Sequence, residues 1–186
     1  DVCSSDLTER HHDDAAIAYS LRALEQSPND PVAHLRLAEL YVDMQRLDDA
    51  IAAYDKTIDL DANNWKAYFA LASIYQQRAE HDKAADLYRR ILRTASDDDT
   101  LTKAGRAAIA LEEINQSLGE LEKVLAPLSS MMSHKPVYRR LLVELYVRYV
   151  PRLVARAQRG PSEIRTAARA ELDRLGHGGM KPLLDA

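Results

Sequence analysis

Residues 31–64 read PVAHLRLAELYVDMQRLDDAIAAYDKTIDLDANN, and residues 65–98 read WKAYFALASIYQQRAEHDKAADLYRRILRTASDD. The two segments are one 34-residue pattern written twice, because identical residues occupy seven equivalent positions. A repeat of this length indicates a fold built from stacked copies of one small unit. The identical pairs are Ala33 and Ala67, Leu37 and Leu71, Ala38 and Ala72, Tyr41 and Tyr75, Asp48 and Asp82, Ala50 and Ala84, and Tyr54 and Tyr88.

The repeated apolar residues have helical spacing. Leu37, Ala38 and Tyr41 follow i, i+1, i+4, and Ala50 and Tyr54 follow i, i+4, so each set lies on one face of a helix. Between the two sets lie polar residues, at 45–48 in the first copy and 79–82 in the second, which predict a short turn. Each copy is therefore predicted to be a helix–turn–helix hairpin, and successive hairpins predict a solenoid.

This pattern of small and aromatic residues resembles the tetratricopeptide repeat. His34 and Tyr68 stand where that family usually has Trp, Ala38 and Ala72 stand where it has Gly, and the closing Pro remains only as Pro28 of the preceding unit. The resemblance implies an all-α fold, a right-handed α-solenoid of stacked antiparallel hairpins. It also implies a mode of action, which is binding other proteins or peptides rather than catalysing a reaction.

The repeats are expected to begin before residue 31. Residues 1–7, when back-translated, resemble the end of a common short-read sequencing adapter, and we expect them to be a non-native tail. Residues 8–134 are predicted to form TPR-like helical repeats. They begin with the second helix of an earlier hairpin, at about residues 13–26, whose first helix we expect to be cut away. The inter-repeat turn then places Asp30 as an N-cap and Pro31 at the first helical position.

The C-terminal part departs from the repeat. The acidic run at 97–99 is expected to cap a helix and not to hold a cation. Residues 135–160 are predicted to form a long linking helix or a diverged repeat, interrupted at Pro151. Residues 161–186 resemble the first hairpin of a HEAT-type repeat, and their end is expected to be truncated. The expected fold class is thus an all-α TPR-like solenoid followed by HEAT-like helices.

The charge of the chain is distributed unevenly. Residues 8–98 carry more acidic than basic groups, whereas residues 135–186 carry eleven Lys and Arg against five Asp and Glu, although the whole chain has a net charge of −4. An arginine-rich helical segment can bind nucleic acid or an anionic membrane. Acids interleave with these arginines and stacking aromatics are few, so we favour a solvated face or one that docks on acidic repeats of the same or another molecule. Nucleic acid is not expected as a partner.

No motif in the sequence indicates catalysis. The six histidines lack metal-ligand spacing, and His34 holds a packing position of the repeat, where a packed or capping role is expected. We expect no enzyme activity, no cofactor, no metal and no small-molecule substrate. No run of eighteen apolar residues could cross a membrane. The compartment is not encoded in what remains of the chain, and the cytoplasm is only the default expectation.

The predicted function depends on surface shape. In hairpin repeats of this family the first helices line a concave groove, and their non-packing residues point into it. Leu35, Glu39, Phe69 and Ser73 occupy positions where chaperone-tail-binding members have Lys and Asn, so a clamp for a terminal carboxylate is not expected. A peptide or helix held at a few points is expected instead. The predicted partner-binding residues are Leu35, Arg36, Glu39, Asp43, Lys66, Phe69, Ser73, Gln76 and Gln77.

Two functions of different class follow from this reading. The first is a non-catalytic scaffold or adaptor that binds a protein or peptide partner in the groove. The alternative is the regulatory or spacer arm of a larger, truncated polypeptide, whose catalytic or nucleic-acid-binding part is missing. The sequence does not identify the partner.

Overall fold

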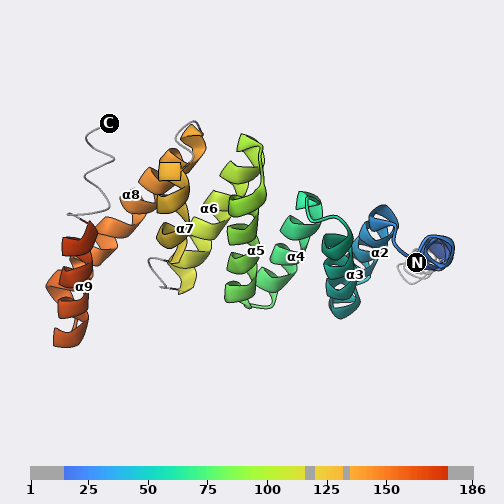
Figure 1. Ribbon diagram of the computed structural model, residues 1–186. Helices are drawn as coiled ribbons and strands as arrows, with labels where there is room; N and C mark the ends of the chain where they lie inside the picture. Colours follow the sequence, from blue (N-terminus) through green and yellow to red (C-terminus); the bar gives the residue numbers. More distant parts are fainter. Residues whose placement is uncertain (1–14, 116–119, 132–134, 176–186) are drawn as a thin grey trace, which may run out of the picture. The chain divides into compact units, whose positions relative to one another are not determined.

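The computed structural model of the chain describes residues 15–115, 120–131 and 135–175, and within those ranges it contains helices and no strand (Figure 1). This confirms the predicted all-α fold, an α-solenoid of helical hairpins. Residues 15–26 form the first described helix. The others are α2 (Pro31–Asp43), α3 (Leu47–Leu60), α4 (Trp65–Gln77), α5 (His81–Thr94), α6 (Asp98–Asn115), α7 (Glu120–Met131), α8 (Pro136–Arg159) and α9 (Ser162–Arg174).

The helices belong to two compact units, residues 1–88 and 89–186, and the division falls within α5. In the first unit α2 packs on α3, and α3 packs on α4. In the second unit α6 contacts both α7 and α8, α7 contacts α8, and α8 packs on α9. Helices that are neighbours in sequence are therefore neighbours in space, as expected when each repeat contacts only the next. The predicted division of the chain into segments 1–7, 8–134, 135–160 and 161–186 stays a prediction.

The repeated apolar residues form the core of the first unit. Leu37, Ala38, Ala50 and Tyr54 of the first copy are buried, and so are their equivalents in the second copy. The paired tyrosines Tyr41 and Tyr75 are half-buried, and a cationic side chain lies over each ring. The Arg46 guanidinium lies 4.6 Å from the centroid of the Tyr41 ring, and the Lys83 ammonium lies 5.1 Å from that of Tyr75.

Each hairpin begins with a side-chain cap. Asp30 accepts a hydrogen bond from the backbone N–H of Val32 at 2.9 Å, and Pro31 follows at the first helical position, as predicted. Asn64, one period later, accepts from the N–H of Ala67 at 3.3 Å. The acidic run at 97–99 also serves as a cap, because Asp97 accepts from the N–H of Thr100 at 2.8 Å. That hydrogen bond lowers the pKa of Asp97.

The turn inside each hairpin lies slightly earlier than predicted, because Leu47 and Asp48 already belong to α3. After α2, the N–H of Arg46 donates to the carbonyl of Tyr41 at 2.8 Å, and the N–H of Gln45 donates to that of Val42 at 2.9 Å. This pair of bonds is the Schellman motif, which places its central residue in the left-handed region. Gln45 has φ of 59°. One period later Ala79 has φ of 58° and the same pair of hydrogen bonds.

These two positions give a first prediction. Glycine adopts positive φ without steric cost, whereas other L-residues are strained there by about 1–2 kcal/mol. Gln45→Gly and Ala79→Gly are each expected to raise the free energy of unfolding by about 0.5–1 kcal/mol, since the greater freedom of glycine in the unfolded chain offsets part of the gain. Urea unfolding monitored by circular dichroism measures the change. Met44→Gly, at a residue with negative φ, is the control and should destabilise; a loss of stability in all three variants would contradict the prediction.

Helix α8 corrects one prediction, because it continues from Pro136 to Arg159 without interruption at Pro151. Proline has no backbone N–H, so Pro151 cannot donate a hydrogen bond within the helix. Pro151 is exposed, so water can bind the carbonyl group that lacks this donor. The opposite face of the same turns is held by the buried side chains of Tyr149, Leu153 and Ala157. The free energy gained by packing this face exceeds the cost of the lost hydrogen bond, so α8 continues past Pro151.

The region predicted as HEAT-like is described only in part. Helix α9 is present at Ser162–Arg174, and Ala168 and Leu175 on its apolar stripe are buried. Ile164 on the same stripe is 47% exposed. The second helix of that hairpin, the proposed tail at 1–7 and both expected truncations lie outside the described residues.

Candidate functional site: exposed faces of the repeat helices

The nine predicted partner-binding residues divide between two helices. Leu35, Arg36, Glu39 and Asp43 lie on α2, and the other five lie on α4. None of the nine is buried: Arg36, Asp43, Lys66, Ser73 and Gln77 are exposed, and Leu35, Glu39, Phe69 and Gln76 are half-buried. Seven of the positions between them are buried in the core: Leu37, Ala38, Ala67, Tyr68, Leu71, Ala72 and Ile74. The nine side chains are therefore available on the surface.

An ion pair joins the two helices at this surface. The Lys66 ammonium lies 2.5 Å from a carboxylate oxygen of Glu39. The Glu39 side chain is 37% exposed and that of Lys66 is 68% exposed, so solvent screens the pair and it contributes at most about 1 kcal/mol. Its main consequence is geometric, because it brings one predicted residue of α2 against one of α4. A single ligand can therefore contact both helices.

Two of the α4 residues are partly occupied by contacts with α5. The ring of Phe69 lies 5.9 Å from that of Tyr88, centroid to centroid, at a tilt of 46°. The Tyr88 hydroxyl also donates to the side-chain oxygen of Gln76 at 3.5 Å. Burial raises the pKa of Tyr88, which keeps that hydroxyl protonated as a donor. Phe69 thus packs against Tyr88 and remains half-buried at the surface.

Carboxylates act on two tyrosines near this surface. Burial raises the pKa of Tyr54 to about 12, and the negative charges of Glu39 and Asp43 add to the shift. Burial also raises the pKa of Tyr75, with a further contribution from Asp55. Among the nine predicted residues the two acids of α2 are balanced by two bases, Arg36 and Lys66.

The histidine at the start of α2 has the structural role that was predicted. Nε2–H of His34 donates to the backbone carbonyl of Pro28 at 2.9 Å, which ties the inter-repeat turn to the helix. Among the residues that the structure describes, no three His, Cys, Asp or Glu side chains are grouped so that they could hold a metal ion. Within the same part of the chain, no helix has the length and apolarity needed to cross a membrane.

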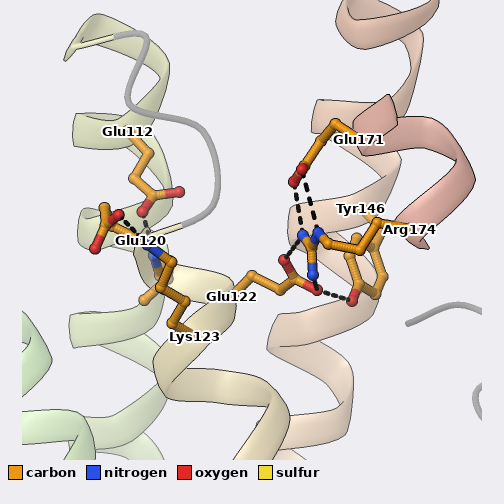
Figure 2. A network of polar contacts seen from close by, with 8 residues as sticks. Glu112, Glu120, Glu122, Lys123, Tyr146, Glu171 and Arg174 are labelled. Carbon is orange, nitrogen blue, oxygen red and sulfur yellow. Dashed lines mark hydrogen bonds and ion pairs between the residues drawn. The ribbon is translucent and has the colours of Figure 1, made fainter. Parts of the chain in front are cut away.

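A cluster of titratable groups lies elsewhere, in the second unit, and joins α7, α8 and α9 (Figure 2). Glu122 is 5% exposed and accepts a hydrogen bond from the Tyr146 hydroxyl at 2.8 Å. The Arg174 guanidinium donates to both oxygens of Glu122, and also to Glu171 at 2.6 Å. Hydrogen bonds from Arg174 lower the pKa of Glu171, whereas burial, together with the bond to Glu122, raises that of Tyr146.

This cluster links three helices. The Tyr146 hydroxyl, the Glu122 and Glu171 carboxylates and the Arg174 guanidinium each bond to another member of the cluster. A neighbouring helix carries a second buried acid, Glu112 of α6, which accepts a hydrogen bond from the N–H of Leu121 and so satisfies a donor in the first turn of α7. Figure 2 shows Glu112 beside that helix start. The two glutamates fix α7 between its neighbours.

The structure also shows a surface that the sequence analysis missed. Helix α8 carries valines at 143, 147, 150 and 154, and Val143 and Val147 are 44% and 68% exposed. The packing residues of this helix, such as Tyr138 and Leu141, are buried. The valines fall at i, i+4, i+7 and i+11, so the signal was present in the pattern between the packing positions.

Fold and surface together define the class: a helical-repeat protein whose exposed helix faces are suited to contact with other proteins. Two family models, each described as tetratricopeptide repeat, match residues 7–59 and 35–99, which together span half of the chain. The chain belongs to the tetratricopeptide repeat family. Members of this family are typically non-catalytic scaffolds that bind proteins or peptides, so its general role is that of a protein–protein interaction scaffold.

The chain is also similar to individual proteins. General transcription factor 3C polypeptide 3 of Homo sapiens is 31% identical over 84 residues, 45% of this chain and 10% of that protein. Among solved structures, MamA is 23% identical with a TM-score of 0.50, covering 78% of this chain and 81% of MamA. A tetratricopeptide repeat protein from Parabacteroides merdae is 16% identical with a TM-score of 0.50, covering 95% and 70%. The chain spans about a tenth of the length of the curated relatives that it matches.

Proposed function

We propose that this chain is a non-catalytic adaptor that holds a peptide or helix of a partner protein across the surface of α2 and α4. The observation that supports this most directly is the ion pair between Glu39 and Lys66, since it joins the two helices into one continuous surface. Leu35 and Phe69 provide half-buried apolar contacts on either side of it. A ligand with two apolar side chains, and a basic group able to reach the exposed carboxylate of Asp43, would match these contacts.

The ligand is expected to bind through its side chains and not through a terminal carboxylate. Glu39 would repel a carboxylate, and Lys66 is already paired with Glu39. A peptide selected on this protein should therefore bind equally well as a free acid and as a C-terminal amide. A strong preference for the free acid would contradict this part of the proposal.

The binding prediction is tested by selecting peptides from a display library against the full chain and then measuring their affinity for variants. Leu35→Ala combined with Phe69→Ala is expected to weaken the selected peptides about tenfold or more, because both apolar contacts are removed. The matched control is Tyr19→Ala with Leu21→Ala, which removes one aromatic and one leucine that are 75% and 44% exposed on the helix at 15–26.

Circular dichroism of both double variants checks that helicity is retained, since Phe69 also packs on Tyr88. Equal affinity for the wild type and the Leu35/Phe69 variant would reject α2 and α4 as the binding surface. The alternative function, a regulatory or spacer arm of a larger polypeptide, predicts that no selected peptide depends on these residues. Recovery of the full open reading frame tests that alternative directly.

A further inference from the structure

Helix α8 is apolar on two opposite sides, and only one side is explained by packing within the second unit. Tyr138, Leu141 and Leu145 are buried on one side, where α8 contacts α6, α7 and α9. On the other side the four valines at 143, 147, 150 and 154 follow one line along the helix, and we call them the valine stripe. Val143 and Val147 are exposed and the other two are half-buried.

The stripe lies beside a hollow in the surface. A cavity of about 370 Å³ is lined by Pro136, Arg139, Arg140, Val143 and Glu144, all from the first two turns of α8. Single exposed apolar residues are ordinary on protein surfaces, whereas an aligned set next to a hollow indicates a contact surface. The spacing of the stripe is that of a helix that packs along a second helix.

The charge around the stripe is positive. Arg140 is exposed at the edge of the hollow. The one acid in the lining, Glu144, already contacts two arginines, since its carboxylate lies 3.4 Å from Arg106 and 3.1 Å from Arg148. Basic residues outnumber acidic ones in the sequence from Lys135 onward. A ligand on this surface gains from negative charge beside its apolar contacts.

Other occupants match these features less well. A second copy placed α8 against α8 would bring arginine-rich surfaces together, which like-charge repulsion disfavours. Single-stranded nucleic acid is typically bound by stacking of its bases on aromatic side chains, and here the exposed side chains along the stripe are aliphatic. Aliphatic contacts at helical spacing, bordered by arginines, are complementary to a helix with an aliphatic face and acidic flanks.

We propose that the valine stripe of α8 binds an acidic amphipathic helix of a partner protein. The surface lies in the second unit and shares no residue with the α2 and α4 surface, so this inference does not depend on the proposed function. The chain then has two proposed binding surfaces: one on α2 and α4, and one on α8 for an acidic segment.

The test uses a designed helical peptide with leucines at i, i+4, i+7 and i+11 and glutamates at the flanking positions, labelled for fluorescence anisotropy. It is titrated with the full chain, beside a scrambled peptide of the same composition and a peptide with lysines in place of the glutamates. We expect binding of the designed peptide only, and weaker binding as salt rises. Val143→Asp with Val147→Asp should weaken it at least about tenfold, and Arg140→Glu should weaken it and reduce its salt dependence.

Two control variants make the result specific. Ile164→Asp places the same charge at another exposed aliphatic residue of the second unit, on α9, and should leave binding unchanged. The Leu35→Ala and Phe69→Ala variant should also bind normally; if it does not, the peptide occupies the α2 and α4 surface and the inference is wrong. Equal binding of the scrambled peptide, or no effect of the valine substitutions, would overturn it as well.

Two further outcomes would assign the stripe to a different occupant. Sedimentation that shows a dimer of the wild type, converted to a monomer by Val143→Asp with Val147→Asp, would make the stripe an interface between copies. Tight, salt-dependent binding of a mixed-sequence DNA that displaces the peptide would make it a nucleic-acid surface. Either result contradicts the inference; a monomer whose peptide is not displaced by DNA supports it.

Discussion

Glu122→Ala is expected to release α9 from the second unit and to lower the free energy of unfolding by about 3 kcal/mol, which is typical when one partner of a buried ion pair is removed. Glu122 is the acceptor for the buried hydroxyl of Tyr146 and for the guanidinium of Arg174, which comes from a helix 52 residues further along the chain. Without it, a buried hydroxyl has lost its acceptor and α9 has lost its polar link to α7. The expected cost is near the lower end of the usual range because the Arg174 side chain is 52% exposed and can be hydrated.

Hydrogen exchange of the α9 amides, with urea unfolding of the whole chain, measures this effect. Glu122→Gln keeps an acceptor for Tyr146 but removes the charge, so its cost should be smaller. Tyr146→Phe removes a single hydrogen bond and should cost about 1 kcal/mol. Lys123→Ala, at the exposed neighbouring position, should change little. If Glu122→Ala matched Lys123→Ala in stability and in α9 exchange, the cluster would not hold α9.

Acid should weaken a second contact of Arg174 in the wild type, its ion pair with Glu171 within α9. The folded-state pKa of Glu171 is lowered, chiefly by its hydrogen bond with Arg174. A carboxylate with a lowered pKa contributes stability at neutral pH, and this contribution is lost as the pH falls through its folded value. Exchange of the α9 amides should therefore accelerate, relative to a Glu171→Gln variant, only below the ordinary pKa of a glutamate. An identical acid response in wild type and variant would show that Glu171 has no part in it.

Gly105→Ala is expected to destabilise the second unit by about 2 kcal/mol, the usual cost of overpacking a core. A methyl group at Gly105 in α6 would lie 2.6 Å from Cδ2 of Leu141 in α8, and closer still to Cδ1. Leu141 is 2% exposed, so its side chain would have to repack within the core and cannot move out into solvent. In an isolated helix the same substitution would stabilise by about 1 kcal/mol. The sign of the effect therefore reports whether α6 and α8 approach each other closely.

A double-mutant cycle makes this prediction decisive. In a Leu141→Ala background the obstructing side chain is gone, so Gly105→Ala should become neutral or stabilising. Urea unfolding of the four proteins gives the coupling free energy, which is expected to exceed about 1 kcal/mol. Ala110→Gly, at an exposed position of the same helix, measures the effect of helix propensity on the free energy of unfolding without a packing contribution. A destabilisation by Gly105→Ala of equal size in both backgrounds would reject the close approach.

The repeat explains why so much of the fold could be predicted. Packing positions such as Leu71 and Tyr88 recur with the period of the unit, and a residue whose surroundings recur is identifiable from spacing alone. Caps are also local, so Asp30 with Pro31 could be assigned from two adjacent residues. Pro151 was misjudged because its local effect favours a helix end, whereas buried residues on the opposite face of the same turns keep α8 continuous.

The candidate binding surfaces were predictable only in part. Nine residues on α2 and α4 were assigned as outward-pointing by their position in the repeat, and all are at least partly accessible. Their mutual contacts were not predictable, because Glu39 meets Lys66 through space and Phe69 rests on a ring nineteen residues later. The valine stripe was missed because α8 lies beyond the clear repeats, where no second copy marks which positions face outward.

The sequence by itself determined the helices, their pairing into hairpins and the class of function, since each of these depends on spacing within thirty-four residues. The tertiary structure alone decided which charges and rings come together: Glu39 with Lys66, Glu122 with Arg174, and Gly105 against Leu141. These contacts join residues far apart in the chain, and their geometry follows from how one helix lies on another. Periodicity fixes which face of a helix turns inward, but only packing fixes what that face meets.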